Sequence, residues 1–567
     1  MSYELIEPGL RVDIDTRYMQ HHGSSARADS GVVLLFHDAD GDTLLHLRAA
    51  TMDMEGGDRV DLGGAITASG DSLVVWADSL IWERSGRRLM LPGEVRVEAA
   101  KGEETGRNLE TDLDLSSWRI GRVAGRYWGT AAGRAYDVTV AADSAVSVRS
   151  GGRTTVEYSS ATVRSDDLVL HSPVAVYDGH GGALDLAGGV AARDSLEEVR
   201  ADALSYQLGI SSWQAAGSVE LTRGDWQLAA DTLRRDGDAK PLVALGSPAA
   251  VRQADRTLKA TRLEYLDDER EFVARGQVVF HRNGTELRAG RVSFMEGAET
   301  IAGSGGVTLQ TDGVEGQLAA DSLFLHLADD QAVLFGAPRL VRPAGTESLT
   351  VAAAVLRVDL ERETLAGNGE YLLQSGSVSM TAHRGTIAPG DDGSDVVTLA
   401  GSVTVENDDG VVRGDSMETR LVDGRIAEVR VPGRLDVQTM TAAEQATWVR
   451  GRDATIVLAE NRIDLIELGA EAEVIHNDAA GDEVSQISGQ RMELLFAAGA
   501  GLVRIHVTGE AQFTSRLASG RETEEPALNQ VRGEELAVLL EGGQIDEVII
   551  TRPQGNYYPG PKEGSPQ

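Results

Sequence analysis

The sequence contains no cysteine, few aromatic residues and no excess of basic residues. Without cysteine the chain can form neither a disulfide framework nor a thiolate metal site, although this absence does not choose a compartment. Aromatic residues make up 5% of the chain, whereas glycine occurs 65 times. The formal charge of −36, from 53 Lys and Arg against 89 Asp and Glu, offers no basic footprint to a phosphate backbone. We therefore expect no nucleic-acid partner.

Long hydrophobic runs are also missing. No run of 18 or more apolar residues could form a membrane-spanning helix, and residues 1–11 lack the apolar core of a secretion signal. Hydrophobic residues are nevertheless 41% of the chain and charged residues 25%, which is typical of a folded protein. The sequence thus indicates either a cytoplasmic protein or a chain from which a targeting or anchoring segment is absent.

What the sequence does contain is a repeat of about 30 residues. In each copy, a glycine is followed two residues later by an apolar residue that opens a short alternating segment. Such a period is typical of a stacked array, in which each unit buries its apolar face against its neighbours. We therefore look for function along a surface rather than in one pocket. The clearest copies begin at Gly188, Gly217, Gly246, Gly276, Gly305 and Gly336, which are spaced by 29, 29, 30, 29 and 31 residues.

Within each repeat the apolar residues alternate with a period of two. Val219 and Leu221 fall on one face of an extended chain, while Glu220 and Thr222 fall on the other. Such alternation predicts half-buried strands, and helical periodicity is scarce. The fold class is therefore predicted to be all-β, a long antiparallel array; residues 442–449 are the best helix candidate, but we interpret them as loop or strand.

A second signature, Leu-x-Ala-Asp-x-Leu, follows each strand start. In residues 318–323, Leu318 and Ala320 share a face, but Leu323 has the opposite parity. A bulge or bend at Asp321-Ser322 would return Leu323 to the apolar side, so we expect the chain to turn a corner there from one sheet to another. Short hairpin turns are predicted where small polar residues separate alternating arms, at 283–284, 408–410, 423–425, 460–462 and 542–544.

No catalytic or metal-binding constellation rises above this background. The eleven histidines are scattered without metal-ligand spacing, and no Ser, His and Asp set stands out. Residues 38–42 resemble a calcium loop, but Thr43 and Ala49 stand where its glycine and its bidentate glutamate belong, so a hairpin turn is the better interpretation. We expect no enzyme, no cofactor and no metal.

The repeat unit resembles the OstA-like repeat of the LptA family of lipopolysaccharide-transport bridge proteins. The resemblance rests on Gly-x-Val, then Leu-x-Ala-Asp-x-Leu, then a turn and Ile-x-x-Val-x-Val-x-Gly, and it covers residues 129–555 as an extended array. The first 128 residues are similar to the periplasmic domain of the LptC family, and residues 556–567 are expected to form a disordered tail. The last element of the unit stands at 426–433, 463–469 and 502–509, and the LptC-like pattern at 32–53, 77–82, 93–97 and 106–120.

The resemblance implies a β-jellyroll, or β-taco, whose groove shields lipid acyl chains. It implies a periplasmic bridge for lipopolysaccharide between an inner-membrane Lpt transporter complex at the N-terminal end and an outer-membrane LptD-like translocon at the C-terminal end, joined by edge-strand β-augmentation. Phospholipid is an alternative cargo, and a structural or adhesive solenoid with a closed core is the alternative class. The residues expected to line the groove are Val95, Val97, Val219, Leu221, Val278, Phe280, Val307, Leu309, Val403 and Val405.

Overall fold

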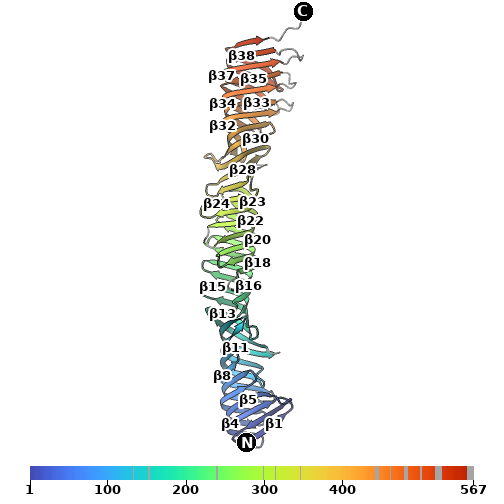
Figure 1. Ribbon diagram of the computed structural model, residues 1–567, viewed down its shortest axis with the longest axis vertical. Coiled ribbons are helices and arrows are strands. Elements are labelled where there is room, and N and C mark those ends of the chain that lie inside the picture. Colours follow the sequence, from blue (N-terminus) through green and yellow to red (C-terminus); the bar gives the residue numbers. More distant parts are fainter. Residues whose placement is uncertain are drawn as a thin grey trace, which may run out of the picture. The chain divides into compact units, whose positions relative to one another are not determined.

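The computed structural model consists of β-strands joined by turns (Figure 1). Two compact units divide the chain, Met1–Gly276 and Gln277–Gln567. In the part that the structure describes, no helix is long and apolar enough to cross a membrane. The described residues are all of 1–567 except 132, 151–152, 238–239, 296, 298, 313, 345–346, 441–445, 460–461, 478–482, 498–500, 518–526 and 559–567.

The first unit contains nineteen complete strands, and β20 (Glu271–Arg282) contains the division. The strands are β1 (Ser2–Glu7), β2 (Leu10–Asp15), β3 (Tyr18–His22), β4 (Ser25–His37), β5 (Thr43–Glu55), β6 (Arg59–Ser69), β7 (Leu73–Glu83), β8 (Arg88–Ala99), β9 (Gly102–Asp112), β10 (Ser117–Ala131), β11 (Arg134–Ser150), β12 (Arg153–Ser165), β13 (Leu168–Asp178), β14 (Ala183–Arg193), β15 (Glu197–Gln207), β16 (Ser212–Arg223), β17 (Trp226–Asp236), β18 (Leu242–Gln253) and β19 (Arg256–Leu266).

The second unit continues in the same manner. Its strands are β21 (Thr285–Met295), β22 (Thr300–Thr311), β23 (Val314–His326), β24 (Gln331–Phe335), β25 (Arg339–Ala344), β26 (Glu347–Ala352), β27 (Val355–Asp359), β28 (Thr364–Ser375), β29 (Val378–Pro389), β30 (Asp395–Asn407), β31 (Gly410–Val422), β32 (Arg425–Met440), β33 (Ala446–Ala459), β34 (Arg462–Asn477), β35 (Glu483–Gly489), β36 (Arg491–Ala497), β37 (Gly501–Leu517), β38 (Ala527–Glu541), β39 (Gln544–Thr551) and β40 (Gln554–Tyr558).

Most long strands pair antiparallel with the strands before and after them in the chain, as β14, β15 and β16 do. One sequence repeat is therefore a pair of strands, because Gly188 and Gly217 mark equivalent places in β14 and β16. The prediction of an all-β antiparallel array of stacked repeats is confirmed.

Each long strand bends at a corner near its middle. In β16, Gly217 and Ser218 have φ angles of 76° and 46°, and together they oppose one residue of β17, Asp231. A Cβ on Gly217 would lie 2.3 Å from Asp202 Oδ2, so only glycine fits. The glycine of one signature thus packs against the aspartate of the other at this corner, as Gly336 does against Asp321.

The predicted change of face between Leu318 and Leu323 is confirmed, because both side chains are buried. The extra residue lies elsewhere than expected: the pairs Ser304 with Ser322 and Val307 with Ala320 leave two glycines opposite Asp321. The bulge therefore belongs to the Gly-x strand, since glycine accepts the positive φ that the added residue requires.

The corners divide the strands of a unit into two ladders. The first half of β16, 212–216, pairs with the last residues of β15 and β17, and its second half, 219–223, pairs with their first residues. In the first unit we call the ladder that contains 219–223 ladder A and the ladder that contains 212–216 ladder B. In the second unit, ladder A contains 307–311 of β22 and ladder B contains 300–304.

The turns that join the strands lie at the ends of the ladders away from the corners. The turns at 283–284, 408–409, 423–424 and 542–543 form as predicted, and Asp423 and Gly424 have the two positive φ angles of a tight hairpin. The predicted turn at 460–462 lies mostly outside the described residues, as does the first part of 442–449, whose remainder begins strand β33.

The predicted domain limits stay predictions. Strand β10 runs without interruption through residues 128 and 129. Residues 554–558 form β40, which pairs with β38, and the rest of the expected tail, 559–567, lies outside the described residues.

Candidate functional site

The ten residues predicted to line a groove all point into the interior between the ladders. Their exposed fractions run from 0% for Leu309 to 6% for Val405. Each lies in the half of its strand that follows a corner. The strand register places Val95, Val97, Val219 and Leu221 on ladder A of the first unit, and Val307, Leu309, Val403 and Val405 on ladder A of the second. The sequence signal Gly-x-Val therefore located one wall of the interior.

The ten predicted groove residues include none from the opposite wall, although the leucine expected to return to the apolar side is the sequence signal for it. The last leucine of the Leu-x-Ala-Asp-x-Leu signature lies on ladder B and is buried: Leu204 and Leu233 in the first unit, and Leu323 in the second. The change of parity at the corner carries this leucine inward, facing the valines of ladder A. The interior between the ladders is thus lined on both sides, mainly by Val, Leu, Ala and Ile.

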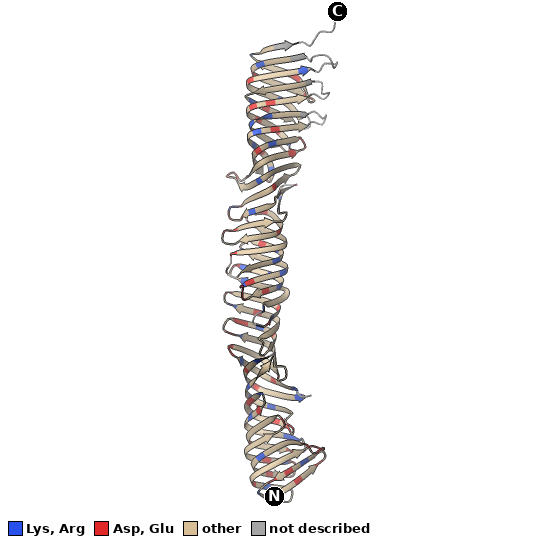
Figure 2. Cartoon of the chain, viewed as in Figure 1, with Lys and Arg blue, Asp and Glu red and all other residues tan. Residues whose placement is uncertain are grey.

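The two edges of this interior are closed differently. At the corner the chain itself passes from one ladder to the other. At the opposite edge, which we call the mouth, the turns of ladder A approach the turns of ladder B, and only side chains connect them. Figure 2 shows that both signs of charge are interspersed along the strands and turns of the chain.

In the first unit, four charged side chains bridge the mouth. Arg235 of ladder B contacts Glu197 of ladder A at 3.3 Å and Asp267 of its own ladder at 3.2 Å, and Arg223 of ladder A also pairs with Asp267. Burial raises the pKa of Glu197, and the positive charge of Arg235 opposes this rise. The side chains are 8–28% exposed, so these ion pairs are partly withdrawn from water.

Aromatic rings lie beside this ionic cluster. Trp226 of ladder A packs against Tyr265 and Phe272, with ring centroids 5.3 and 5.1 Å away. The guanidinium of Arg223 lies 5.0 Å from the centre of the Tyr265 ring. Charged and aromatic groups together therefore bridge the mouth at this level, beside a hollow of about 190 Å³ that Glu197 and Arg235 also line.

Other bridges cross the mouth along both units. Near the N-terminus, Arg84 binds Glu7 at 2.6 Å. In the second unit Arg282 donates to the carbonyl of Leu327 at 2.8 Å, Arg342 pairs with Asp395, and Arg462 pairs with Asp409 at 3.3 Å. Further along, Ser375 donates to the carbonyl of Gly424 at 3.1 Å, and His476 Nε2 donates to the carbonyl of Gly543 at 2.8 Å. We call these contacts the mouth bridges.

Ion pairs on the outer faces have a different character. The Arg126–Asp137 pair has side chains 55% and 51% exposed, and the Arg430–Glu418 pair has side chains 62% and 53% exposed. Exposed pairs of this kind contribute little to stability because water and salt screen them. The mouth bridges, both ion pairs and hydrogen bonds, are therefore the polar contacts expected to influence how the two ladders hold together.

A cavity of about 300 Å³ lies between the ladders of the first unit. Its ladder A wall includes Leu73, Val97 and Tyr127, and its ladder B wall includes Trp118 and Val156. Lys101, Arg149 and His180 are exposed at its rim, and Arg149 donates to Ser72 of the other ladder at 2.5 Å. Of the predicted groove residues, Val97 is the one that lines this cavity.

A polar cluster crosses the interior beside the cavity. Tyr158 of ladder B donates to Glu104 Oε1 of ladder A at 2.7 Å, and the hydroxyl of Tyr127 contacts that of Tyr158. The hydroxyls of Tyr136 and Tyr177, again from opposite ladders, lie 3.0 Å apart. Burial raises the pKa of Glu104 to about 7, against the lowering effect of the Tyr158 hydrogen bond. Sequence reasoning missed Glu104, although it has the inward parity of strand β9.

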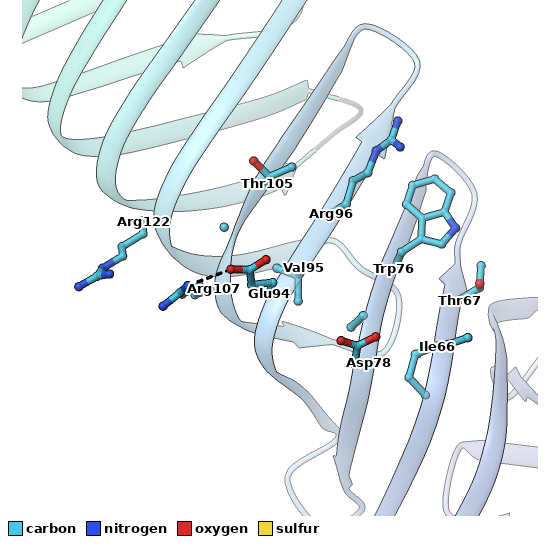
Figure 3. Close-up of a pocket in the computed structure, with 13 residues that line it drawn as sticks. Ile66, Thr67, Trp76, Asp78, Glu94, Val95, Arg96, Thr105, Arg107 and Arg122 are labelled. Carbon is cyan, nitrogen blue, oxygen red and sulfur yellow. Dashed lines mark hydrogen bonds and ion pairs between the residues drawn. The ribbon is translucent and has the colours of Figure 1, made fainter.

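A larger hollow of about 600 Å³ lies beside the corners of β6 to β10 (Figure 3). It is lined by side chains of both signs, such as the Glu94–Arg107 ion pair at 2.8 Å, and Arg96 lies 5.3 Å from the Trp76 ring. These charged side chains are exposed and already paired, so the hollow offers no defined ligand chemistry. Among the described residues, no group of three or more His, Asp or Glu is placed to hold a metal ion.

No family model matches the chain, and no curated protein matches it. Among solved structures, similarity is found to LptH of Pseudomonas aeruginosa, the LptA homologous periplasmic component of the lipopolysaccharide transport device. That match has 10% identity and a TM-score of 0.13, and it covers 24% of this chain and 75% of LptH. A second match, to the TcdB2-TccC3 structure, has 7% identity and a TM-score of 0.06, with 95% of this chain and 51% of that chain covered. Neither superposition is close enough to define the function of this chain.

Proposed function

We propose that this protein is a non-enzymatic lipid conduit that holds acyl chains in the interior between its two ladders. The observation that carries the proposal is the difference between the two edges. The interior is lined by aliphatic side chains, closed at the corner by the continuous chain and closed at the mouth only by side-chain bridges. The ladders could therefore separate at the mouth without breaking a strand.

The energetics of such an interior suit transport. Burial of one acyl methylene contributes about 0.8 kcal/mol, so a chain of a dozen methylenes would be held firmly. Because the walls repeat every two strands, neighbouring positions offer nearly the same contacts. Sliding from one position to the next would then change the free energy little, and no chemical step is required.

The cargo and location that we propose are lipopolysaccharide and the periplasm. The repeat signature of the sequence resembles the LptA family, and LptH is described as a component of a lipopolysaccharide transport device. The acidic chain does not favour phosphorylated head groups, so we place the heads outside the mouth and the acyl chains inside. Phospholipid would use the same interior and is the alternative cargo.

The partners that we propose are an inner-membrane Lpt transporter complex at the N-terminal end and an outer-membrane LptD-like translocon at the C-terminal end. Support comes from strand edges: within the described residues, β1 pairs with β2 alone, and β39 and β40 pair with β38 alone. The free edges of such strands are suited to main-chain pairing with a strand of another protein.

A structural or adhesive solenoid with a closed core is the second candidate. It is favoured by the complete burial of the predicted wall residues, such as Val219 and Leu309, and by the low exposure of the mouth bridges. In that case the interior would be an ordinary core that no ligand enters.

Photo-crosslinking in cells that produce lipopolysaccharide separates these candidates. A crosslinking residue placed at Val278 or Val403 faces the interior, and matched controls at Arg275 and Glu406 are exposed. Lipopolysaccharide attached at both interior positions and at neither control is the expected result. Phospholipid at the same positions would support the lipid conduit but show that its cargo is phospholipid. If neither interior position formed a lipid adduct, the conduit would be contradicted and the closed solenoid supported.

A further inference from the structure

The polar cluster beside the interior cavity contains an unsatisfied acceptor. Glu104 is 3% exposed, and its Oε1 accepts a hydrogen bond from Tyr158. Its Oε2 is buried and has no hydrogen-bond partner among the described residues. Buried polar atoms are satisfied in the great majority of cases, so an orphaned carboxyl oxygen requires an explanation.

The neighbouring hydroxyls cannot supply the missing bond. The Tyr158 hydroxyl donates to Oε1, and the Tyr127 hydroxyl lies against Tyr158, so both donors are engaged in one chain that ends at Glu104. Tyr136 and Tyr177 bond to each other, and neither of them has a hydrogen bond to Glu104. The terminal torsion of a glutamate is broad, so the carboxyl group can turn toward the cavity that Glu104 lines, with both oxygens moving together and the Tyr158 hydrogen bond lengthening.

The cavity wall and the carboxyl group of Glu104 together indicate which kind of ligand group would bond to Oε2. The cavity wall is largely apolar, with Val97, Trp118 and Val156 facing it, and its volume of about 300 Å³ lies within the range of small-ligand sites. An ionised carboxylate needs a donor at Oε2, whereas a neutral carboxyl that carries its proton there needs an acceptor. A hydroxyl group can serve either state because it both donates and accepts.

We propose that this cavity is a binding site for an aliphatic chain that carries a hydroxyl group, with the chain against Val97 and Trp118 and the hydroxyl on Glu104 Oε2. The inference deepens the proposed conduit and rests on it for the aliphatic nature of the cargo. Elsewhere the wall residues are mainly aliphatic and would distinguish chains largely by length and area. Here a polar group would be recognised, so hydroxylated chains would be retained longer than plain ones.

Two isomeric probes test the proposal on the full chain. 1-Octanol and 1-methoxyheptane have the same atoms, but only the alcohol can donate a hydrogen bond. At pH 8.5, above the pKa of about 7 to which burial raises Glu104, the carboxylate requires a donor. Calorimetric titration is expected to show the alcohol binding about tenfold or more tightly than the ether, as a hydrogen bond to a charged group provides.

Two variants test whether the preference for the alcohol depends on Glu104. Glu104→Leu removes the acceptor and is expected to abolish the preference while ether binding persists, which also reports that the cavity remains formed. Tyr158→Phe leaves both carboxylate oxygens free and is expected to retain the preference. Equal binding of the two probes to the wild-type chain, or an unchanged preference in Glu104→Leu, would overturn the proposal.

The outcome is independent of the conduit experiment. Crosslinks at Val278 and Val403 report whether lipid enters the interior in cells, whereas the probe pair reports recognition at Glu104. A preference for the alcohol without lipid at the two positions would support the Glu104 site and contradict the conduit. Lipid at both positions without a preference for the alcohol would support the conduit and contradict the Glu104 site.

Discussion

The corner and the mouth of each unit close the same interior by different means. At the corner, covalent chain and a glycine in the left-handed region join the ladders, as at Gly217 with a φ of 76°. At the mouth, side chains from turns far apart in sequence meet, as Arg235 meets Glu197. The corner is therefore held by the chain itself, whereas the mouth is held by side-chain contacts alone.

The largest effect is expected from breaking a corner. A Cβ on Gly336 would lie 2.5 Å from Asp321 Cβ, a clash that cannot be relieved without moving a strand, and its φ is 76°. Gly336→Ala is expected to lower the free energy of unfolding by about 3 kcal/mol, the combined cost of backbone strain and overpacking. Denaturant unfolding of the full chain measures this loss.

Gly306 is the matched control for that substitution. It has the same φ of 76°, but a Cβ there would meet nothing within 4 Å. Gly306→Ala should therefore cost only the backbone strain, about 1 kcal/mol. Equal losses in the two variants would mean that the close approach of glycine to aspartate does not hold the corner.

A second effect is expected inside the interior, where Glu104 connects the ladders away from both edges. Its pKa is raised from 4.5 to about 7 mainly by burial, with the Tyr158 hydroxyl as its hydrogen-bonded neighbour. The unfolded chain releases this proton near pH 4.5 and the folded chain near pH 7. The folded state therefore binds more protons between these values, and its stability falls as pH rises through this window.

Glu104→Gln removes this fall because glutamine does not titrate. The variant should match the wild-type chain at pH 4 and exceed its free energy of unfolding by about 3 kcal/mol at pH 8, from about 1.4 kcal/mol for each unit of pKa shift. Unfolding curves at both pH values test the sign. A gain of the same size at pH 4 and pH 8 would show that ionisation of Glu104 is not its cause.

A smaller effect is expected at the mouth. Arg235→Ala leaves Glu197, which is 8% exposed, without its nearest cross-mouth charge. Loss of one partner from a partly buried pair should lower the free energy of unfolding by about 2 kcal/mol and speed hydrogen exchange in the turns beside β15 and β17. Exchange at the corner of β16 should not change.

Arg126→Ala is the control on the outer face, where Arg126 and Asp137 form an exposed pair. Its unfolding transition and exchange rates should match those of the wild-type chain. If both variants behaved alike, the mouth bridges would be ordinary surface pairs and the contrast between the two edges would fail.

Much of the fold follows from local sequence. Val219 and Leu221 share a face because successive strand residues alternate, and the Gly-x-Val signature marks a corner because glycine tolerates a positive φ. The hairpin turn at Asp423-Gly424 follows from the same preference. The exact place of the bulge was wrong because parity requires one extra residue but does not say which strand contains it.

The site was less predictable because its contacts join distant residues. Glu104 and Tyr158 are 54 positions apart, and Arg84 reaches Glu7 across 77 positions. No periodicity identifies such pairs, since charged residues occur at many of the turns and only the spacing of the ladders decides which of them meet.

The sequence by itself determined the strands, their period, their corners and one wall of the interior, because each depends on backbone preferences within a few residues. Tertiary structure alone decided that Leu204 and Val219 belong to facing ladders, that a row of bridges closes the mouth, and that Glu104 is buried with one oxygen unsatisfied. These features depend on how two ladders approach through space, and the burial that creates them exists only when both ladders are in place.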